Sequence, residues 1–339
     1  MKAYFLPGGA RRAAVVGTIL AAVSAVSLTA ACTARGPAAP PGTSPATSPP
    51  SAAGAGQPAQ AGHAAGLSGW LYYVDRSSDR LLRLTSSGLV QVLGAGGRNA
   101  NVSPDGRRVA YLDEAANVLV ADSNGAHQRT VLRGSVPAGY EPAWAPDSNR
   151  LLVVRAAADG ATVPGVVEVN TGGFTPLRHT PNGIHYLWSA DGGHLGYATG
   201  ICQLGVAGID GDNPRLVPVI GDRNPSVNPD RKRSCDPFSL SPDGSRMAVD
   251  LHTGNTDDGD IGRNLSANAV IDTRTGATVR LPVNGTITAV LFQPDGGMLV
   301  RTRSATANLL TLISPTGTIT TQTTEPATTK DLSLIAYTP

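Results

Sequence analysis

One short turn unit recurs along most of this chain and limits the folds open to it. Each copy begins with an apolar residue. It continues with Ser, Ala or Gln, then Pro or Ala, then Asp, and then Gly or Ser, and a new apolar run follows. The aspartates of the five copies are Asp105, Asp147, Asp191, Asp243 and Asp295, in steps of 42, 44, 52 and 52 residues. A period in this range indicates a repeat built from one supersecondary unit.

The residues of each copy have the chemistry of a turn between two strands. Proline sets φ at the first turn position, Asp tolerates a tight bend, and Gly supplies positive φ. A third strand follows, as at 117–122, and then a fourth, as at 128–132. No helical periodicity is visible from 70 to 339, so we predict an all-β region of four-stranded blades arranged as a β-propeller.

The two ends of the repeat region look like halves of one further unit. Residues 70–75 resemble a strand that follows a turn, and residues 331–337 resemble the strand that precedes one. Joining them rebuilds a sixth copy and pairs the edges that an open array would leave exposed. We therefore predict six blades, closed by the C-terminal strand.

These repeats resemble those of TolB-type propellers, which have an aromatic or apolar residue, Ser, Pro, Asp and Gly before a short β-run. The resemblance covers roughly residues 70–339, the whole predicted folded region. It implies the propeller architecture and, less specifically, a binding or scaffolding role in the cell envelope. No folded domain is predicted ahead of the propeller, unlike in TolB itself.

The first 32 residues have the layout of an export signal. Basic residues, a long apolar run and small residues lead to Cys32, in a sequence that resembles a lipobox whose Leu lies one place early. The alternative is a transmembrane helix that is retained. We predict a lipoprotein signal peptide over 1–32 with lipidation at Cys32, a disordered Ala/Pro/Gly/Ser-rich tether over 33–68, and the propeller over 69–339.

Charge and cysteine usage narrow the partners and the compartment. Four of the 27 basic residues precede residue 70, and no acidic residue does. The region from residue 70 therefore has 23 basic and 25 acidic residues, a net charge of −2, which gives no reason to expect nucleic acid as a partner. An extracytoplasmic location predicts a disulfide between Cys202 and Cys235. The alternative is two buried free thiols.

The sequence offers little catalytic chemistry. We find none of the common zinc, nucleophile-elbow, phosphate-loop or paired-cysteine motifs, predict no catalytic residue, and expect the scattered histidines to serve surface or packing roles. The five repeated aspartates are predicted to cap their own turns. Trp144 and Trp188 are expected to pack between blades, with ligand stacking as the alternative for one of them.

One long insertion, residues 252–264, is rich in side-chain oxygens. Its Asp257, Asp258 and Asp260 are candidate Ca²⁺ ligands, although their spacing is not that of an EF-hand and a solvated acidic loop is the simpler interpretation. No other metal or cofactor is expected.

We predict a lipid-anchored, extracytoplasmic binding or scaffolding protein of the cell envelope. Its partner would be another envelope protein or a small ligand on the propeller rim or channel. The alternatives are a propeller enzyme, either a hydrolase or a lyase acting on sugars or lactones, and a sensor of small ligands or glycans.

Overall fold

The computed structural model describes residues 66–136, 141–157, 161–180, 183–254 and 265–339. The predicted signal peptide, Cys32 and the tether up to residue 65 lie outside the described residues, as do Asp257, Asp258 and Asp260. Within the described ranges, no helix has the length and apolar character needed to cross a membrane.

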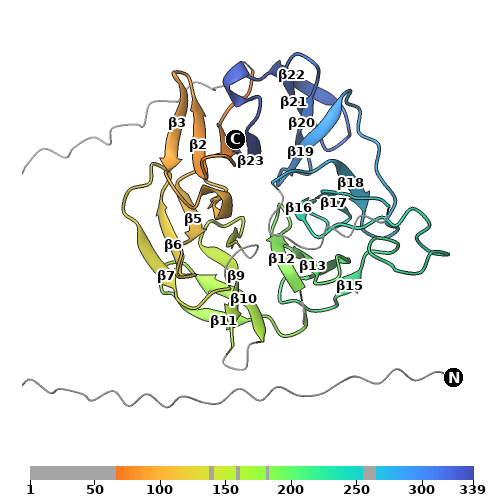
Figure 1. Cartoon of the computed structure of the whole chain (residues 1–339), viewed down its shortest axis with the longest axis horizontal. Coiled ribbons are helices and arrows are strands. Elements are labelled where there is room, and N and C mark those ends of the chain that lie inside the picture. The colour runs from red at the N-terminus through yellow and green to blue at the C-terminus, as the bar shows by residue number, and fades with distance from the viewer. Residues whose placement is uncertain (1–65, 137–140, 158–160, 181–182, 255–264) are drawn as a thin grey trace, which may run out of the picture. The chain divides into compact units, whose positions relative to one another are not determined.

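Six antiparallel sheets follow one another around a central axis (Figure 1). The first blade contains β23 (Ser333–Thr338), β1 (Trp70–Asp75), β2 (Arg80–Thr85) and β3 (Gly88–Leu93). The second contains β4 (Asn101–Val102), β5 (Arg108–Leu112), β6 (Val118–Asp122) and β7 (Arg129–Leu132). The third contains β8 (Ala143–Trp144), β9 (Arg150–Ala156), β10 (Thr162–Glu168) and β11 (Phe174–Pro176).

The other three blades continue the order along the chain. The fourth contains β12 (Gly183–Trp188), β13 (His194–Thr199), β14 (Leu204–Gly208) and β15 (Arg215–Leu216). The fifth contains β16 (Pro237–Leu240), β17 (Arg246–Val249) and β18 (Ala269–Asp272). The sixth contains β19 (Thr286–Phe292), β20 (Met298–Arg303), β21 (Asn308–Ile313) and β22 (Ile319–Thr324). In the described chain, the helical elements are two short 3₁₀ turns, η1 (Gly97–Asn99) and η2 (Ala327–Thr329).

The C-terminal strand closes the ring. β23 pairs antiparallel with β1, with Trp70 opposite Thr338 and Val74 opposite Ser333. Figure 1 shows the dark blue β23 beside the orange strands of the first blade. The prediction of a six-bladed, all-β propeller closed by its last strand is confirmed.

The fifth blade and the domain boundary differ in detail from the sequence prediction. The fifth blade has three strands rather than four, because only a single bridge, from Thr278 to Ile271, continues the sheet beyond β18. Leu67, which we placed in the tether, is buried among apolar residues of the first and sixth blades. Packing of the propeller therefore begins two residues before the predicted boundary at residue 69.

The hydrophobic core is divided among the interfaces between neighbouring blades. Six apolar clusters are present in the described residues, and each draws its members mainly from two adjacent blades. Alternate residues of a strand point to opposite faces of its sheet, so every blade contributes apolar residues to both neighbours. This is why the strands are apolar at nearly every position rather than at every second one.

Candidate functional site

The two edges of the ring carry different connections. The five repeated aspartates lie in turns at one edge, which we call the turn rim. The opposite edge, the loop rim, carries the connections that enter each first strand and those between second and third strands. The connection 217–236 is on the loop rim, as are the ends of β17 and β18, which the connection 250–268 joins. Loops held on a rigid scaffold commonly carry binding residues.

A small cavity lies along the central axis. The first strands β4, β8, β12 and β16 of four successive blades line it, and its volume is about 150 Å³. Its polar lining includes Glu141 and His185, and its apolar lining includes Tyr186 and Phe238. Neither Lys nor Arg is among the described residues that line it.

One residue of the fifth blade packs among residues of blades that do not border it. Leu265 belongs to the connection after β17 in the fifth blade, yet it is fully buried in the core cluster of the first and second blades, together with Val102 and Ile335. The backbone N–H of Ala267 then donates to the carbonyl of Thr288 in β19. The fifth blade borders neither of the first two blades, so Leu265 packs away from its own blade, among first-strand residues of the first two.

His185 occupies an irregular position on the first strand of the fourth blade. The register between β12 and β13 shifts between Ile184 and Leu187, and His185 itself has a φ of 51°. Such bulges redirect a side chain, and positive φ is uncommon for a residue other than glycine. The side chain is buried, and its Nδ1 lies 3.8 Å from Oδ1 of Asp236.

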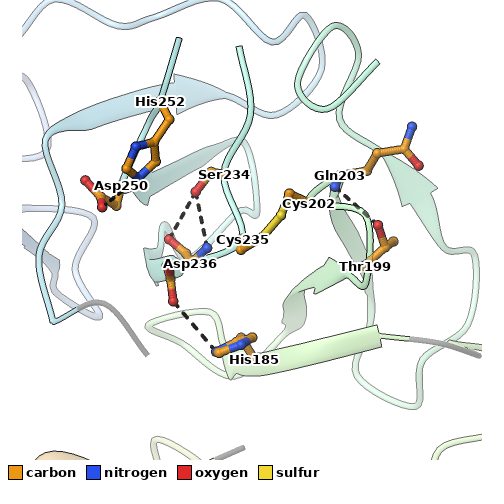
Figure 2. The surroundings of a disulfide bond; sticks show 9 residues. All are labelled: His185, Thr199, Cys202, Gln203, Ser234, Cys235, Asp236, Asp250 and His252. Carbon is orange, nitrogen blue, oxygen red and sulfur yellow. Dashed lines mark hydrogen bonds and ion pairs between the residues drawn. A yellow bond between two sulfur atoms is a disulfide. The ribbon is translucent and has the colours of Figure 1, made fainter. Parts of the chain in front are cut away.

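Asp236 is held in place by its neighbours in the chain. It directly follows Cys235, which forms a disulfide with Cys202 across a sequence separation of 33 residues. The Ser234 hydroxyl donates to the Asp236 carbonyl at 3.4 Å. The predicted disulfide is present, and it fixes the end of the long connection 217–236 next to Asp236 (Figure 2).

A second imidazole–carboxylate pair lies on the adjoining connection. Nε2 of His252 is 3.0 Å from Oδ2 of the buried Asp250. The backbones of His252 and Arg233 exchange two hydrogen bonds of 2.9 and 3.0 Å, which join the two longest loops. Figure 2 shows both pairs beside the disulfide. We call Glu141, His185, Asp236, Asp250 and His252 the channel-mouth cluster.

The cluster suits hydrogen bonding and proton transfer. Its described members include three carboxylates and two imidazoles, but within the described ranges no three His, Cys, Asp or Glu side chains converge to hold a metal ion. An imidazole beside a carboxylate can donate from one ring nitrogen and accept at the other. The cluster can therefore bind a ligand that carries hydrogen-bond donors or positive charge.

The five repeated aspartates each lie in a different blade and bond within their own turns. Asp243 accepts from the Ser241 hydroxyl at 2.7 Å and from the Ser245 amide at 3.0 Å. The other four also accept the amide two residues further on, as an Asx turn does: Asp105, Asp147, Asp191 and Asp295. Partial burial would raise the pKa of Asp243, but the hydrogen bonds from Ser241 and Ser245 outweigh it and lower the pKa to about 2.

Sequence reasoning singled out neither His185 nor Asp236. The available signal was a histidine inside an otherwise apolar first strand, Gly183–Trp188, and a carboxylate next to a paired cysteine. The tryptophans lie between blades: the ring of Trp144 packs under Arg108 of the second blade, and the ring of Trp188 packs under Arg150 of the third, each at 5.2 Å.

No protein-family model and no curated protein sequence matches this chain. Among solved structures, TolB from Acinetobacter baumannii superposes with a TM-score of 0.52 at 16% sequence identity, covering 80% of this chain and 67% of that one. The fold is a TolB-like propeller.

Two further structures superpose less closely on the propeller. A putative TolB from Agrobacterium tumefaciens has a TM-score of 0.44 at 12% identity, covering 80% of this chain and 98% of that one. A nidogen/laminin complex has a TM-score of 0.45 at 10% identity, covering 78% and 95%.

Proposed function

We propose that this protein is an extracytoplasmic, lipid-anchored binding protein of the cell envelope, and that its propeller holds a partner at the channel mouth on the loop rim. The channel-mouth cluster is the observation that carries this proposal. It joins buried and half-buried polar groups from four separate segments on a scaffold closed into a ring. Such a scaffold can present a binding surface with little loss of conformational entropy.

The location is supported by two features. The Cys202–Cys235 disulfide is of a kind that persists in oxidising compartments outside the cytoplasm. The sequence up to Cys32 resembles a lipoprotein signal. A Cys32→Ser variant should move the protein from the membrane fraction to the soluble fraction, and retention of the variant in the membrane would rule out the lipid anchor.

The mouth offers hydrogen-bonding and acidic groups to a partner segment. Glu141 lines the cavity, and Asp236 lies beside its His185. Complementary polar and charged groups set partner choice and association rate.

Crosslinking in membranes, followed by purification of the complex, tests the proposal. The Glu141→Lys variant should lose the crosslinked partner, because it reverses the charge at the mouth. Glu168→Lys is the matched control, since Glu168 is an exposed carboxylate at the end of β10 on the opposite rim. Equal capture by both variants, or no specific partner for the unaltered protein, would contradict a docking role for the channel mouth.

The second candidate is an extracytoplasmic hydrolase or lyase that works in the channel. It is favoured by the buried His185, which is backed by Asp236 and shares a cavity with Glu141, because a histidine oriented by a carboxylate is a common general base. A His185→Asn variant that binds the partner normally but abolishes turnover of a sugar or lactone substrate would favour the enzyme. A variant that loses partner binding alone would favour the binding protein.

A further inference from the structure

A second and larger cavity lies at the turn rim, between the third and fourth blades. It has a volume of about 560 Å³ and is lined by the ends of β9, β10 and β12, the segment 175–179 and the turn at 209–212. We call it the interblade groove. Its size falls within the range of small-molecule binding sites.

The groove exists because the outer strands of both blades are short. β11 has three residues and β15 has two, whereas the inner strands β9 and β10 of the third blade have seven each. The two blades are therefore filled at the centre of the ring but not at its periphery. Val166, Leu177 and Ile209 supply an apolar surface inside the groove.

Trp188 forms part of the wall and has an unsatisfied polar atom. Only 6% of the residue is exposed, and within the described chain its indole Nε1–H has no hydrogen-bond partner. The equivalent tryptophan of the preceding blade, Trp144, donates its Nε1–H to the Asn101 carbonyl at 3.0 Å. A buried donor without an acceptor is destabilising, so a ligand that reaches this N–H and supplies an acceptor would be favoured. Trp188 also borders the channel cavity, and the experiment below must separate the two sites.

Acceptors and further donors surround Trp188 in the groove. Glu168, Asp210 and Asp212 contribute carboxylates, and Arg178 and His179 contribute donors. Arg150 is already engaged, because it donates to Asp147 at 2.7 Å and lies over the Trp188 ring. The groove thus offers carboxylate acceptors and unpaired donors side by side over an apolar surface.

We infer that the interblade groove binds a neutral, polyhydroxylated ligand, that is, a mono- or disaccharide unit. A sugar hydroxyl both donates and accepts, so adjacent hydroxyls can satisfy the Trp188 N–H and the carboxylates together. An ammonium ion has no lone pair for the indole N–H. A simple anion has no proton for the carboxylates and is repelled by them. This site is separate from the channel mouth and goes beyond the function proposed above.

Titration of the full-length protein with neutral disaccharides tests the inference. We would use cellobiose, maltose and N,N′-diacetylchitobiose, with binding followed by tryptophan fluorescence and by calorimetry. We expect saturable binding of at least one of them below about 10 mM, weakened about tenfold or more by Trp188→Phe and by Asp210→Ala. The Asp210 side chain makes no hydrogen bond within the described chain, so its removal leaves the fold intact.

Two control variants separate the groove from the channel and from general loss of packing. Trp144→Phe removes an indole whose N–H is already satisfied, and Glu141→Gln alters the channel cavity alone; both should bind the sugar normally. The inference is overturned if no disaccharide binds, if binding survives both groove variants, or if Glu141→Gln abolishes it. Tighter binding of glucosamine or glucuronate than of the neutral sugars would also overturn it.

Discussion

The ring should depend strongly on one buried ion pair next to its point of closure. Arg301 on β20 and Glu325, which follows β22, are 2% and 4% exposed. Nε and Nη2 of Arg301 donate to Oε2 of Glu325 at 2.9 and 2.7 Å. Arg301 also donates to the carbonyls of Thr329 and Leu332, which lead into β23. The pair therefore fixes the segment that delivers the closing strand.

Four hydrogen bonds converge on the Glu325 carboxylate. Besides the two from Arg301, the Tyr73 hydroxyl donates at 2.9 Å from β1 and the Thr329 hydroxyl at 3.1 Å. Burial, followed by the Glu325 charge, raises the pKa of Tyr73, so this hydroxyl remains a donor at neutral pH. A Glu325→Gln variant has nearly the same volume but leaves the Arg301 charge buried and uncompensated.

We expect Glu325→Gln to lower the free energy of unfolding by about 3–5 kcal/mol, as when one partner of a buried pair is removed. For a domain of this size that corresponds to a fall in Tm of about 6–10 °C. Urea unfolding monitored by circular dichroism gives the free energy, and hydrogen exchange should show faster exchange in β23 and β1.

The matched control is Arg303→Gln, which removes a cation two residues along the same strand. Arg303 is exposed and makes one long hydrogen bond, 3.4 Å to the Lys330 carbonyl, so its loss should cost less than about 0.5 kcal/mol. The double variant Arg301→Leu with Glu325→Leu should be less destabilised than the two single variants together, since neither charge is then left alone. A loss below about 1 kcal/mol for Glu325→Gln would refute the reasoning.

Three further predictions concern closure, the disulfide and the turns. Deleting residues 331–339 removes β23 and exposes the edge of β1, so the protein should aggregate or melt much lower in calorimetry; an unchanged Tm would contradict closure. Replacing Cys202 and Cys235 by Ser should lower the free energy of unfolding by roughly 3–4 kcal/mol, because the disulfide restricts the chain entropy of a loop closed over 33 residues. An unchanged midpoint of urea unfolding would argue against this. Asp243→Asn should lower the free energy of unfolding at pH 7. Because folding lowers the pKa of Asp243 from 3.8 to about 2, its charge stabilises the fold above about pH 4, and this stabilisation is lost as the pH falls towards 2, so the variant and the unaltered protein should then converge. A difference between them that is independent of pH would show that the charge does not matter.

Much of the architecture could be read from local chemistry. The turn unit around Asp105 and its four counterparts specifies a hairpin wherever it occurs, because Pro, Asp and Gly act on their own backbone and need no distant partner. Six blades followed from the two half-units at the chain ends, and the pairing of β23 with β1 agrees with that count. The missing fourth strand of the fifth blade was not predicted; beyond β18 only the single bridge between Ile271 and Thr278 continues the sheet.

The candidate sites were largely beyond sequence reasoning. His185 and Asp236 are 51 residues apart, and they meet because neighbouring blades bring the starts of β12 and β16 to the same channel. The bulge that places His185 has no turn signature in the residues around it. The sequence predicted the cysteine pair, which lies next to Asp236, but it gave no reason to connect that pair with a histidine.

The sequence by itself determined the repeat, the all-β character and the closure. Turns and apolar strands depend on a few neighbouring residues, and the repeat depends on their spacing along the chain. Only the tertiary structure decided where Leu265 packs, which polar groups meet at the channel mouth, and how two short outer strands leave a groove beside Trp188. These features depend on distances between segments far apart in the chain. Such distances are set by how the blades pack against one another, and no local pattern records them.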